Sequence, residues 1–180
     1  MALPATVYTF DIELADSDRG VYESLALRLA RHPSESEDHL IARLLAYLLE
    51  FVEGLAFSRG MADPDEPAMA VRDLTGAIHA WIDVGMPDAA RLHKASKAAT
   101  RVAVYTYKDP RQFLNRLAGE KIHRADKLEL YAIDRALVSA LVARLDRRVA
   151  FSVSVADREL YVAIGTDNLR GAVVRLHLVA

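Results

Sequence analysis

The sequence predicts a single domain of the mixed α/β class. Strand-like and helix-like patterns alternate along its 180 residues, which favours a fold in which helices pack on sheets. The composition is 52% hydrophobic and 27% charged, which supplies enough apolar material to bury a core and excludes wholesale disorder. No internal repeat and no low-complexity linker divides the chain, so we expect residues 1–180 to form one domain.

Alternating apolar residues predict a strand over residues 6–14, and a second alternating run predicts another strand over 23–30. The next element is a long amphipathic helix. Ser34 is followed three residues later by Glu37, which is the pattern of a capping box, and leucines recur at helical spacing after it. We therefore expect this helix to begin at Ser34 and to continue to Leu55.

Turn and cap signals divide the middle of the chain. A short strand is expected over 57–60, and a loop broken by prolines follows it over 63–67. The turn Asp73–Gly76 has Asp at its first position and Gly at its fourth, which is typical of a type I turn. Asp88 and the pair Asp109-Pro110 then resemble helix starts. The expected elements here are strands 68–72 and 77–84, a helix to about residue 99, strand 102–107 and helix 111–117.

The C-terminal third continues the alternation with strand 128–133 and helix 136–145, and then with strands 151–155, 160–164 and 172–178. The middle of the chain therefore has the order helix, hairpin, helix, strand, helix. The two ends supply about five alternating strands, which we expect to form a second, antiparallel sheet that pairs N-terminal with C-terminal segments.

Composition narrows the function classes. The chain has no Cys, which excludes disulfide scaffolds, thiolate zinc sites, iron–sulfur clusters and cysteine nucleophiles. Its 23 basic and 25 acidic residues leave a net charge of −2, which excludes a strongly basic nucleic-acid binder but permits a local basic patch. No apolar run reaches the ~18 residues that span a bilayer. The N-terminus lacks a signal-peptide pattern. We therefore expect a cytoplasmic protein with no membrane partner.

Carboxylates around the hairpin are the candidate chemistry. Counting outward from the turn Asp73–Gly76 pairs Pro67 with Asp83, and strand alternation puts Asp65 on the same face as Asp83. The turn aspartate shares this face but lies about 20 Å from Asp83 at ~3.3 Å per residue. Asp65 or its neighbour Glu66 is therefore expected to meet Asp83 at the open end of the hairpin.

Two such carboxylates and a lysine are the parts of a Mg²⁺-dependent phosphodiesterase, in which the metal activates water and a lysine neutralises developing charge. Lys94 can reach back toward this strand end from the helix that follows Asp88. A plainer interpretation of each residue stays open. The two loop acids also suit a solvated loop, and the run Arg91, Lys94, Lys97 and Arg101 also suits a solvated helix face.

Ordered motifs run along the chain from its first residues. They are Arg31-His32-Pro33-Ser34-Glu35, Arg59-Gly60, Asp65-Glu66-Pro67, Asp73-Leu74-Thr75-Gly76, Trp81-Ile82-Asp83-Val84-Gly85, Pro87-Asp88, Arg91, Lys94-Ala95 and Tyr105-Thr106-Tyr107. With these motifs the chain resembles the YaeQ family of small bacterial proteins over essentially its whole length. The resemblance implies a compact variant of the PD-(D/E)XK nuclease-like fold, with a core of helix, hairpin, helix and strand.

The same resemblance assigns site residues. Pro64-Asp65 and Ile82-Asp83-Val84 are similar to the acidic motif positions, and Glu35 would be the acid of the first core helix. The third motif position is Gly85 instead of lysine, so Lys94 would have to replace it, and Asp83 is shorter than the glutamate of the family pattern. Helical periodicity favours Glu37 over Glu35 as the residue that faces the site, whereas the family motif favours Glu35.

Two functions follow as expectations. The first is a Mg²⁺- or Mn²⁺-dependent phosphodiesterase with Asp65, Glu66 and Asp83 as metal ligands and Lys94 and Glu35 as further catalytic residues. Its nucleic-acid substrate would contact Arg59, Arg91 and Lys97. The alternative is a non-catalytic protein that keeps the nuclease fold and binds nucleic acid or protein. A monomer is expected in either case. Like charges repel when no metal is bound, so Asp83→Asn is expected to leave stability unchanged or to raise it.

Overall fold

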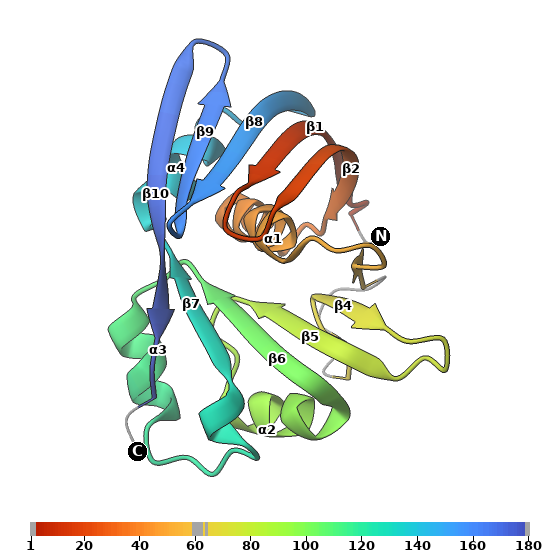
Figure 1. Cartoon of the computed structure of the whole chain (residues 1–180), viewed down its shortest axis with the longest axis vertical. Coiled ribbons are helices and arrows are strands. Elements are labelled where there is room, and N and C mark those ends of the chain that lie inside the picture. Colours follow the sequence, from red (N-terminus) through yellow and green to blue (C-terminus); the bar gives the residue numbers. More distant parts are fainter. Residues whose placement is uncertain (1–2, 59–62, 64, 179–180) are drawn as a thin grey trace. The chain divides into compact units, whose positions relative to one another are not determined.

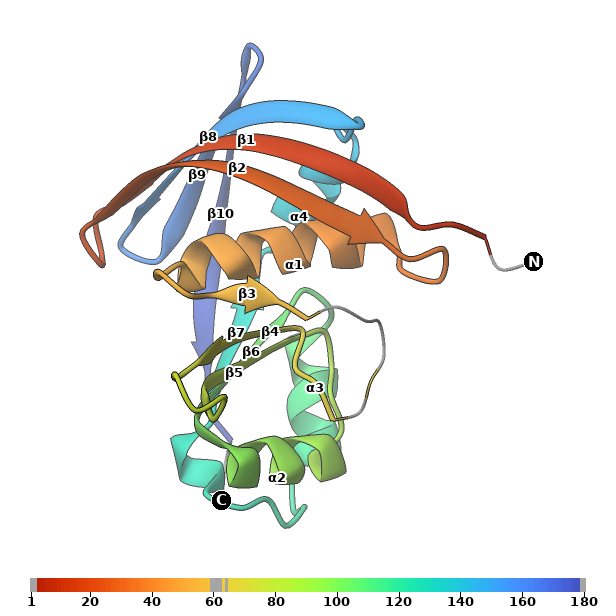
Figure 2. The same ribbon diagram turned by 90° about the vertical axis from the view of Figure 1, so that its right-hand side faces the viewer.

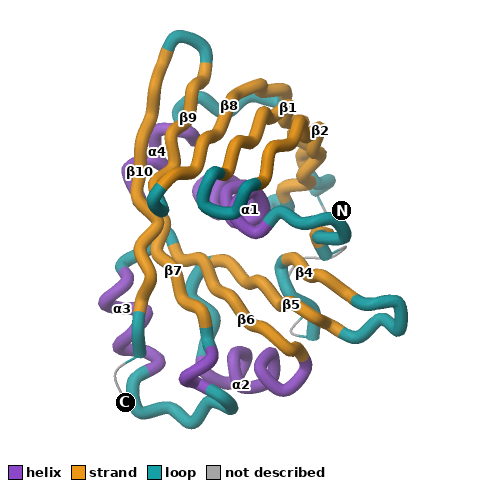
Figure 3. The backbone as a smooth tube through the Cα atoms, viewed as in Figure 1, coloured by secondary structure: helices purple, strands orange, loops and turns teal. Residues whose placement is uncertain are grey.

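The computed structural model describes residues 3–58, 63 and 65–178. These residues form ten β-strands and four α-helices, which confirms the mixed α/β class (Figures 1 and 3). The chain divides into two compact units. The first consists of Met1–Leu49 with Ile133–Val173, and the second of Glu50–Ala132 with Val174–Ala180. None of the described helices is long and apolar enough to cross a membrane.

The first unit is a curved sheet with helices packed on it. Its strands, in spatial order, are β2 (Val21–Arg31), β1 (Thr6–Asp16), β8 (Arg148–Ala156), β9 (Glu159–Ile164) and β10 (Asp167–Leu176). Its helices are α1 (Glu37–Glu50) and α4 (Arg135–Val142). Figure 2 shows α1 running beneath β1 and β2. The apolar stripe of α1 is fully buried at Leu40, Leu44 and Leu48, which is the physical reason that this helix covers the sheet.

The second unit contains the hairpin and the basic run. Its strands follow the order β7 (Glu129–Ile133), β6 (Ala99–Thr106), β5 (Ile78–Val84), β4 (Met69–Arg72) and β3 (Ala56–Phe57). Its helices are α2 (Ala89–Ala98) and α3 (Pro110–Leu117), with the 3₁₀ turn η1 (Ala125–Lys127). Strands β5, β6 and β7 are parallel, and β3, β4 and β5 are antiparallel. Trp81, Leu92 and Phe113 belong to the apolar core between the sheet and α2 and α3.

Several expected elements are confirmed. The hairpin of β4 and β5 is present, and its turn is closed by a hydrogen bond from Gly76 N to Asp73 O of 3.0 Å. Asp88 caps α2 and Asp109 caps α3, as expected. The five strands near the two chain ends do share one sheet. The order helix, hairpin, helix, strand and helix also holds through the middle of the chain.

Four expectations need correction. Helix α1 begins at Glu37 after Ser36, whose hydroxyl accepts a hydrogen bond from His39 N, so Ser34 is not the cap. The helix ends at Glu50, ahead of Gly54 with its positive φ of 94°, and not at Leu55. The sheet of the first unit is not wholly antiparallel, because β1 and β8 run parallel. The strand expected over 57–60 is observed as Ala56–Phe57, while 59 and 60 lie outside the described residues.

Candidate functional site

A β-bulge in the hairpin decides what faces Asp83. The pairing of β4 with β5 shifts by one residue between Val71 and Arg72, and His79 is the extra residue. Ala68 therefore stands opposite Asp83, where the count from the turn had expected Pro67, and that prediction is wrong by one residue. The Ala68 N–H donates to Asp83 Oδ1 at 3.2 Å. One oxygen of the central carboxylate is thus bonded to the backbone at the open end of the hairpin.

Arg91 of α2 binds both oxygens of the Asp83 carboxylate through two nitrogens of its guanidinium group. Arg91 Nε donates to Asp83 Oδ2 at 2.7 Å, and Arg91 Nη2 donates to Oδ1 at 3.1 Å. Asp83 is 3% exposed, so the pair is largely withdrawn from water on its acidic side. Hydrogen bonding to Asp83, more than any other influence, raises the pKa of Arg91. A paired, bidentate contact of this kind is among the strongest hydrogen-bonded ion pairs in proteins.

The same guanidinium group also anchors the acidic loop. Arg91 Nη2 donates to Glu66 O at 2.7 Å, and Arg91 Nη1 lies 3.4 Å from Asp63 O. Its central carbon lies 5.4 Å from the centroid of the Trp81 ring, within the range of a cation–π contact. Arg91 therefore joins α2, β5 and the loop before β4 through one side chain.

The expected loop acids also have cationic partners. Asp65 forms an ion pair with Lys94, and both side chains are more than half exposed. Glu66 Oε2 lies 2.9 Å from Arg72 Nη2, and this pair is exposed as well. The structure thus brings Asp65 to Lys94 and Glu66 to Arg72 as pairs of opposite charge, while the neutral Glu66 carbonyl accepts a hydrogen bond from Arg91. Exposed pairs such as these contribute little to stability, typically about 0–1 kcal/mol.

The side chains at this end of the hairpin do not fit a divalent cation as they stand. Mg²⁺ and Mn²⁺ need several oxygen ligands at one point. No group of three or more His, Asp or Glu residues that could hold a metal ion occurs within 3–58, 63 and 65–178. The Asp83 oxygens are bonded to a guanidinium group and to a backbone N–H, which occupy the positions a metal would need.

Glu35 lies in the first unit, in the segment that precedes α1. Its side chain is 1% exposed and binds two cationic or ionisable groups: Arg43 donates to both carboxylate oxygens at 3.0 Å, and His39 Nδ1 lies 2.7 Å from Oε2. Arg31 Nη1 donates to Glu35 O at 2.8 Å. Glu37 is exposed at the first turn of the helix. Of the two glutamates between which the sequence could not choose, Glu35 is the buried one.

This cluster carries a pH prediction. Burial alone raises the pKa of Glu35, but the hydrogen bonds and charges of His39 and Arg43 outweigh it, and the net pKa is lowered. A carboxyl with a lowered folded-state pKa contributes stability above its unfolded pKa, and this contribution is lost as the pH falls through the folded pKa. Wild type is therefore expected to exceed Glu35→Gln in unfolding free energy at neutral pH.

Urea unfolding of wild type and Glu35→Gln across a pH series measures this difference. We expect the gap to narrow as the pH falls below the ordinary glutamate pKa of about 4.3. Glu37→Gln, an exposed change in the same turn, is the control and should track wild type. A gap that is constant from neutral to acid pH would contradict an ionised Glu35 in the folded protein.

Of the expected nucleic-acid contacts, Arg59 lies outside the described residues and Lys97 is exposed in the last turn of α2. The fourth member of the basic run, Arg101, belongs to β6 and has a different environment. It donates to Glu50 at 2.7 and 2.9 Å and to Glu129 at 2.5 and 2.9 Å. Glu50, the last residue of α1, belongs with Arg101 and Glu129 to the second unit, so two carboxylates share one guanidinium group within that unit.

Tyrosines complete this second charge cluster, which sequence reasoning missed. Tyr105 donates to Glu50 Oε1 at 2.5 Å, and Tyr131 donates to Glu129 Oε1 at 2.9 Å. The two rings stack with centroids 4.9 Å apart. Burial and then the nearby Glu50 charge raise the pKa of Tyr105. The sequence did contain a signal for this cluster: Arg101 and Tyr105 lie four residues apart on one strand and therefore share a face.

Comparisons with known proteins match this chain to YaeQ proteins along nearly its whole length. A family model described as "YaeQ protein" matches residues 1–172. The chain is 33% identical over 170 residues to the "Uncharacterized protein YaeQ" of Escherichia coli (strain K12), and the match covers 94% of each. The crystal structure of the YaeQ protein from Pseudomonas syringae is similar with a TM-score of 0.87 and 32% identity, covering 98% of each chain. The structure of the Xanthomonas axonopodis pv. citri YaeQ protein is similar with a TM-score of 0.85 and 30% identity, covering 95% of this chain and 97% of that one.

Proposed function

The chain belongs to the YaeQ family, and we propose that it is a non-catalytic, protein-binding member whose nuclease-like carboxylates stabilise the fold. The observation that carries this proposal is the bidentate ion pair in which Arg91 donates to both carboxylate oxygens of Asp83. In a metal-dependent phosphodiesterase the central carboxylate has to offer its oxygens to the metal ion. In this chain the central carboxylate is 3% exposed and bonded to a guanidinium group that also holds the neighbouring loop.

The glycine at the third motif position supports the same proposal. A PD-(D/E)XK-like arrangement would have lysine at position 85, two residues beyond the central acid. Gly85 has a φ of 104°, a backbone conformation that residues with a side chain rarely adopt. Its N–H donates to Tyr105 O at 2.9 Å, which ties this conformation to β6. A lysine at this position would be strained, and Lys94 is engaged by Asp65.

Charge favours a protein partner over a nucleic acid. Nucleic-acid affinity depends mainly on cations that are free to neutralise phosphates. The net charge of this chain is −2. Arg91, Lys94 and Arg101, three of the four cations in the basic run, form ion pairs with acids of the same chain. Each pair would have to be broken before its cation could meet a phosphate.

A nuclease assay tests the non-catalytic part of the proposal. Wild type and Asp83→Ala are incubated with single- and double-stranded DNA and RNA in Mg²⁺ and in Mn²⁺. We expect wild type to show no cleavage above Asp83→Ala on any substrate, and equal traces in both would identify a contaminating nuclease. Cleavage by wild type that Asp83→Ala lacks and that Lys97→Ala, an exposed control, retains would overturn the proposal.

A further inference from the structure

Strand β2 forms a long and regular edge of the first sheet. In the described part of the first unit its one neighbouring strand is β1. The two pair residue by residue from Thr6 with Arg31 to Asp16 with Val21, over all 11 residues and with no bulge. Natural proteins usually protect such edges with proline, charged side chains (lysine above all), a bulge or a short strand. The sequence of β2 contains neither proline nor lysine, and its charged residues are Glu23, Arg28 and Arg31.

The hydrogen bonding between β1 and β8 determines which backbone groups of β2 face the open edge. Thr9 N donates to Arg147 O at 2.8 Å, so the odd-numbered residues of β1 direct their backbone groups toward β8 and away from β2. Their partners in β2 must therefore direct theirs away from β1, to the open edge. Ala30 belongs to this set, and its carbonyl accepts a hydrogen bond from Arg43 Nη2 at 3.0 Å. The other members of this set have no such partner among the described residues; they are Tyr22, Ser24, Ala26 and Arg28.

Between the exposed Tyr22 and Arg28, small side chains line the outward-facing side of this edge. Ser24 and Ala26 are the outward-facing residues between Tyr22 and Arg28, and they leave room for a neighbouring chain. On the opposite face Leu25 and Leu27 are half-buried. An added strand would cover both leucines and would extend the core at little cost in side-chain entropy.

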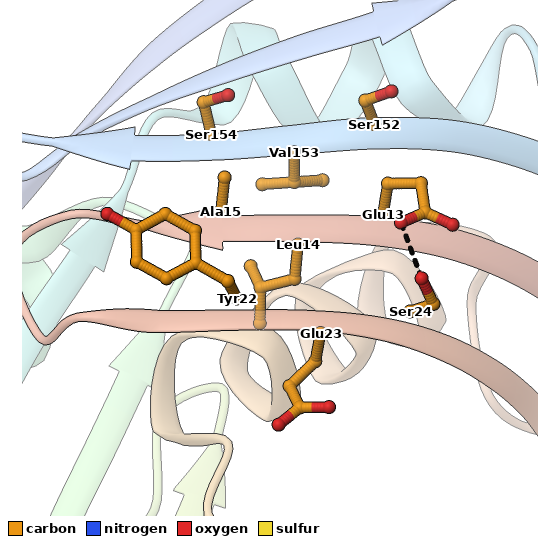
Figure 4. A pocket seen from close by; sticks show the side chains of 9 residues that line it. All are labelled: Glu13, Leu14, Ala15, Tyr22, Glu23, Ser24, Ser152, Val153 and Ser154. Atoms are coloured by element: carbon orange, nitrogen blue, oxygen red, sulfur yellow. Dashed lines mark hydrogen bonds between the residues drawn. The ribbon is translucent and has the colours of Figure 1, made fainter.

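A hollow with negative charge lies beside the same edge (Figure 4). Its volume is about 390 Å³, and its lining comes from β1, β2 and β8: Glu13, Leu14, Ala15, Tyr22, Glu23, Ser24, Ser152, Val153 and Ser154. Glu13 leans toward β2, because its Oε2 accepts a hydrogen bond from Ser24 Oγ at 2.6 Å. Glu13 pairs with Ser24 and lies on its face of the sheet, whereas Glu23 pairs with Leu14 and lies on the other face. Among the described residues Glu13 has no basic partner in an ion pair, and Tyr22 is 65% exposed at one side of the hollow.

We propose that the open edge of β2 binds an extended segment of a partner protein as an added strand. Backbone hydrogen bonds to the edge-facing residues supply affinity, as in other β-strand additions. Charge sets the register: a Lys or Arg of the segment lies beside Ser24 and reaches Glu13, and an Asp or Glu four residues away lies beside Arg28. Two aliphatic side chains between them, separated by one residue, cover Leu25 and Leu27. This inference rests on the protein-binding role proposed above and names its site.

The test begins with a random peptide display library selected on the full chain. The recovered peptides should share an acid and a base four residues apart with two aliphatic residues between them. A synthetic peptide of this consensus is then titrated by fluorescence anisotropy. Methylation of the peptide's edge-facing amide nitrogens should weaken binding about tenfold or more, because each removed N–H loses one backbone hydrogen bond.

A charge exchange tests the register. The double variant Glu13→Arg/Arg28→Glu should weaken binding of the consensus peptide about tenfold, and a peptide with its acid and base exchanged should recover it. The matched control is Glu159→Arg/Arg170→Glu, an exposed ion pair on β9 and β10 of the same sheet. This control should leave affinity within about twofold of wild type. Circular dichroism melts verify that both double variants are folded.

Failure to recover any peptide would overturn the inference. Recovered peptides whose affinity is insensitive to amide methylation and to the exchange at Glu13 and Arg28 would overturn it as well, since they would bind elsewhere. In that second case a protein-binding role survives at another surface. Cleavage of nucleic acid that depends on Asp83 would instead contradict the proposed function itself.

Discussion

Arg101→Met is expected to lower the unfolding free energy by about 2–3 kcal/mol. The substitution keeps much of the side-chain volume but removes the cation that Glu50 and Glu129 share. Glu50 is 8% exposed and would be left as a buried charge, with the Tyr105 hydroxyl as its remaining side-chain partner among the described residues. The Arg101 side chain is 35% exposed, so water reduces the loss below that of a fully buried pair.

Urea unfolding monitored by tryptophan fluorescence measures this change, since Trp81 lies in the core of the same unit. Lys97→Met, an exposed change in the same basic run, should stay within about 0.5 kcal/mol of wild type. Glu50→Gln added to Arg101→Met should recover part of the loss, because it removes the orphaned charge. Unchanged stability of Arg101→Met would show that the cluster does not hold the fold.

Asp83→Asn is expected to destabilise the protein by about 2–3 kcal/mol in chelator, which reverses the expectation drawn from the sequence. The change removes the charge that Arg91 binds and weakens the link between α2, β5 and the loop at Glu66. Arg91 would keep its charge with its side chain partly withdrawn from water. The sequence expectation assumed clustered carboxylates, whereas the structure has pairs of opposite charge.

Thermal and urea unfolding in chelator provide the measurement. Asp65→Asn is the matched control, because its partner Lys94 is more than half exposed and the pair contributes about 0–1 kcal/mol. We expect the control to unfold close to wild type. An Asp83→Asn protein as stable as wild type would restore the interpretation of Asp83 as a repelled, metal-seeking carboxylate.

Local signals predicted the elements of this fold well, because their causes are local. The turn at Asp73–Gly76 depends on residues inside the turn, and the caps at Asp88 and Asp109 bond to backbone groups of the first helical turn. The competing caps before α1 were harder to separate. Ser34 and Ser36 lie two residues apart, and only Ser36 is bonded to a helix N–H, at His39.

Register and strand direction depend on more distant contacts. The extra residue at His79 shifts the partner of Asp83 from Pro67 to Ala68, and nothing in the alternation of the hairpin marks that bulge. The parallel pairing of β1 with β8 joins segments more than 130 residues apart, and the same apolar alternation suits either direction. A count outward from a turn is therefore valid only up to the first bulge.

The ion pairs could not be predicted from the sequence for a similar reason. Arg91, Lys94 and Lys97 recur at a spacing of three, which predicts one basic helix face. In the structure Arg91 turns to Asp83 and Lys94 pairs with Asp65. The sequence could not show that the partners of these acids are the cations that were expected to face phosphate.

A double-mutant cycle at Asp83 and Arg91 tests the central claim most directly. Asp83→Asn, Arg91→Met and the double variant are unfolded in urea with chelator and again with Mg²⁺ or Mn²⁺. We expect a coupling energy of about 1.5–3 kcal/mol that is the same with and without metal, because the two side chains bind each other. A coupling energy near zero in chelator, together with stabilisation of wild type but not Asp83→Asn by Mn²⁺, would contradict the account and make Asp83 a metal ligand.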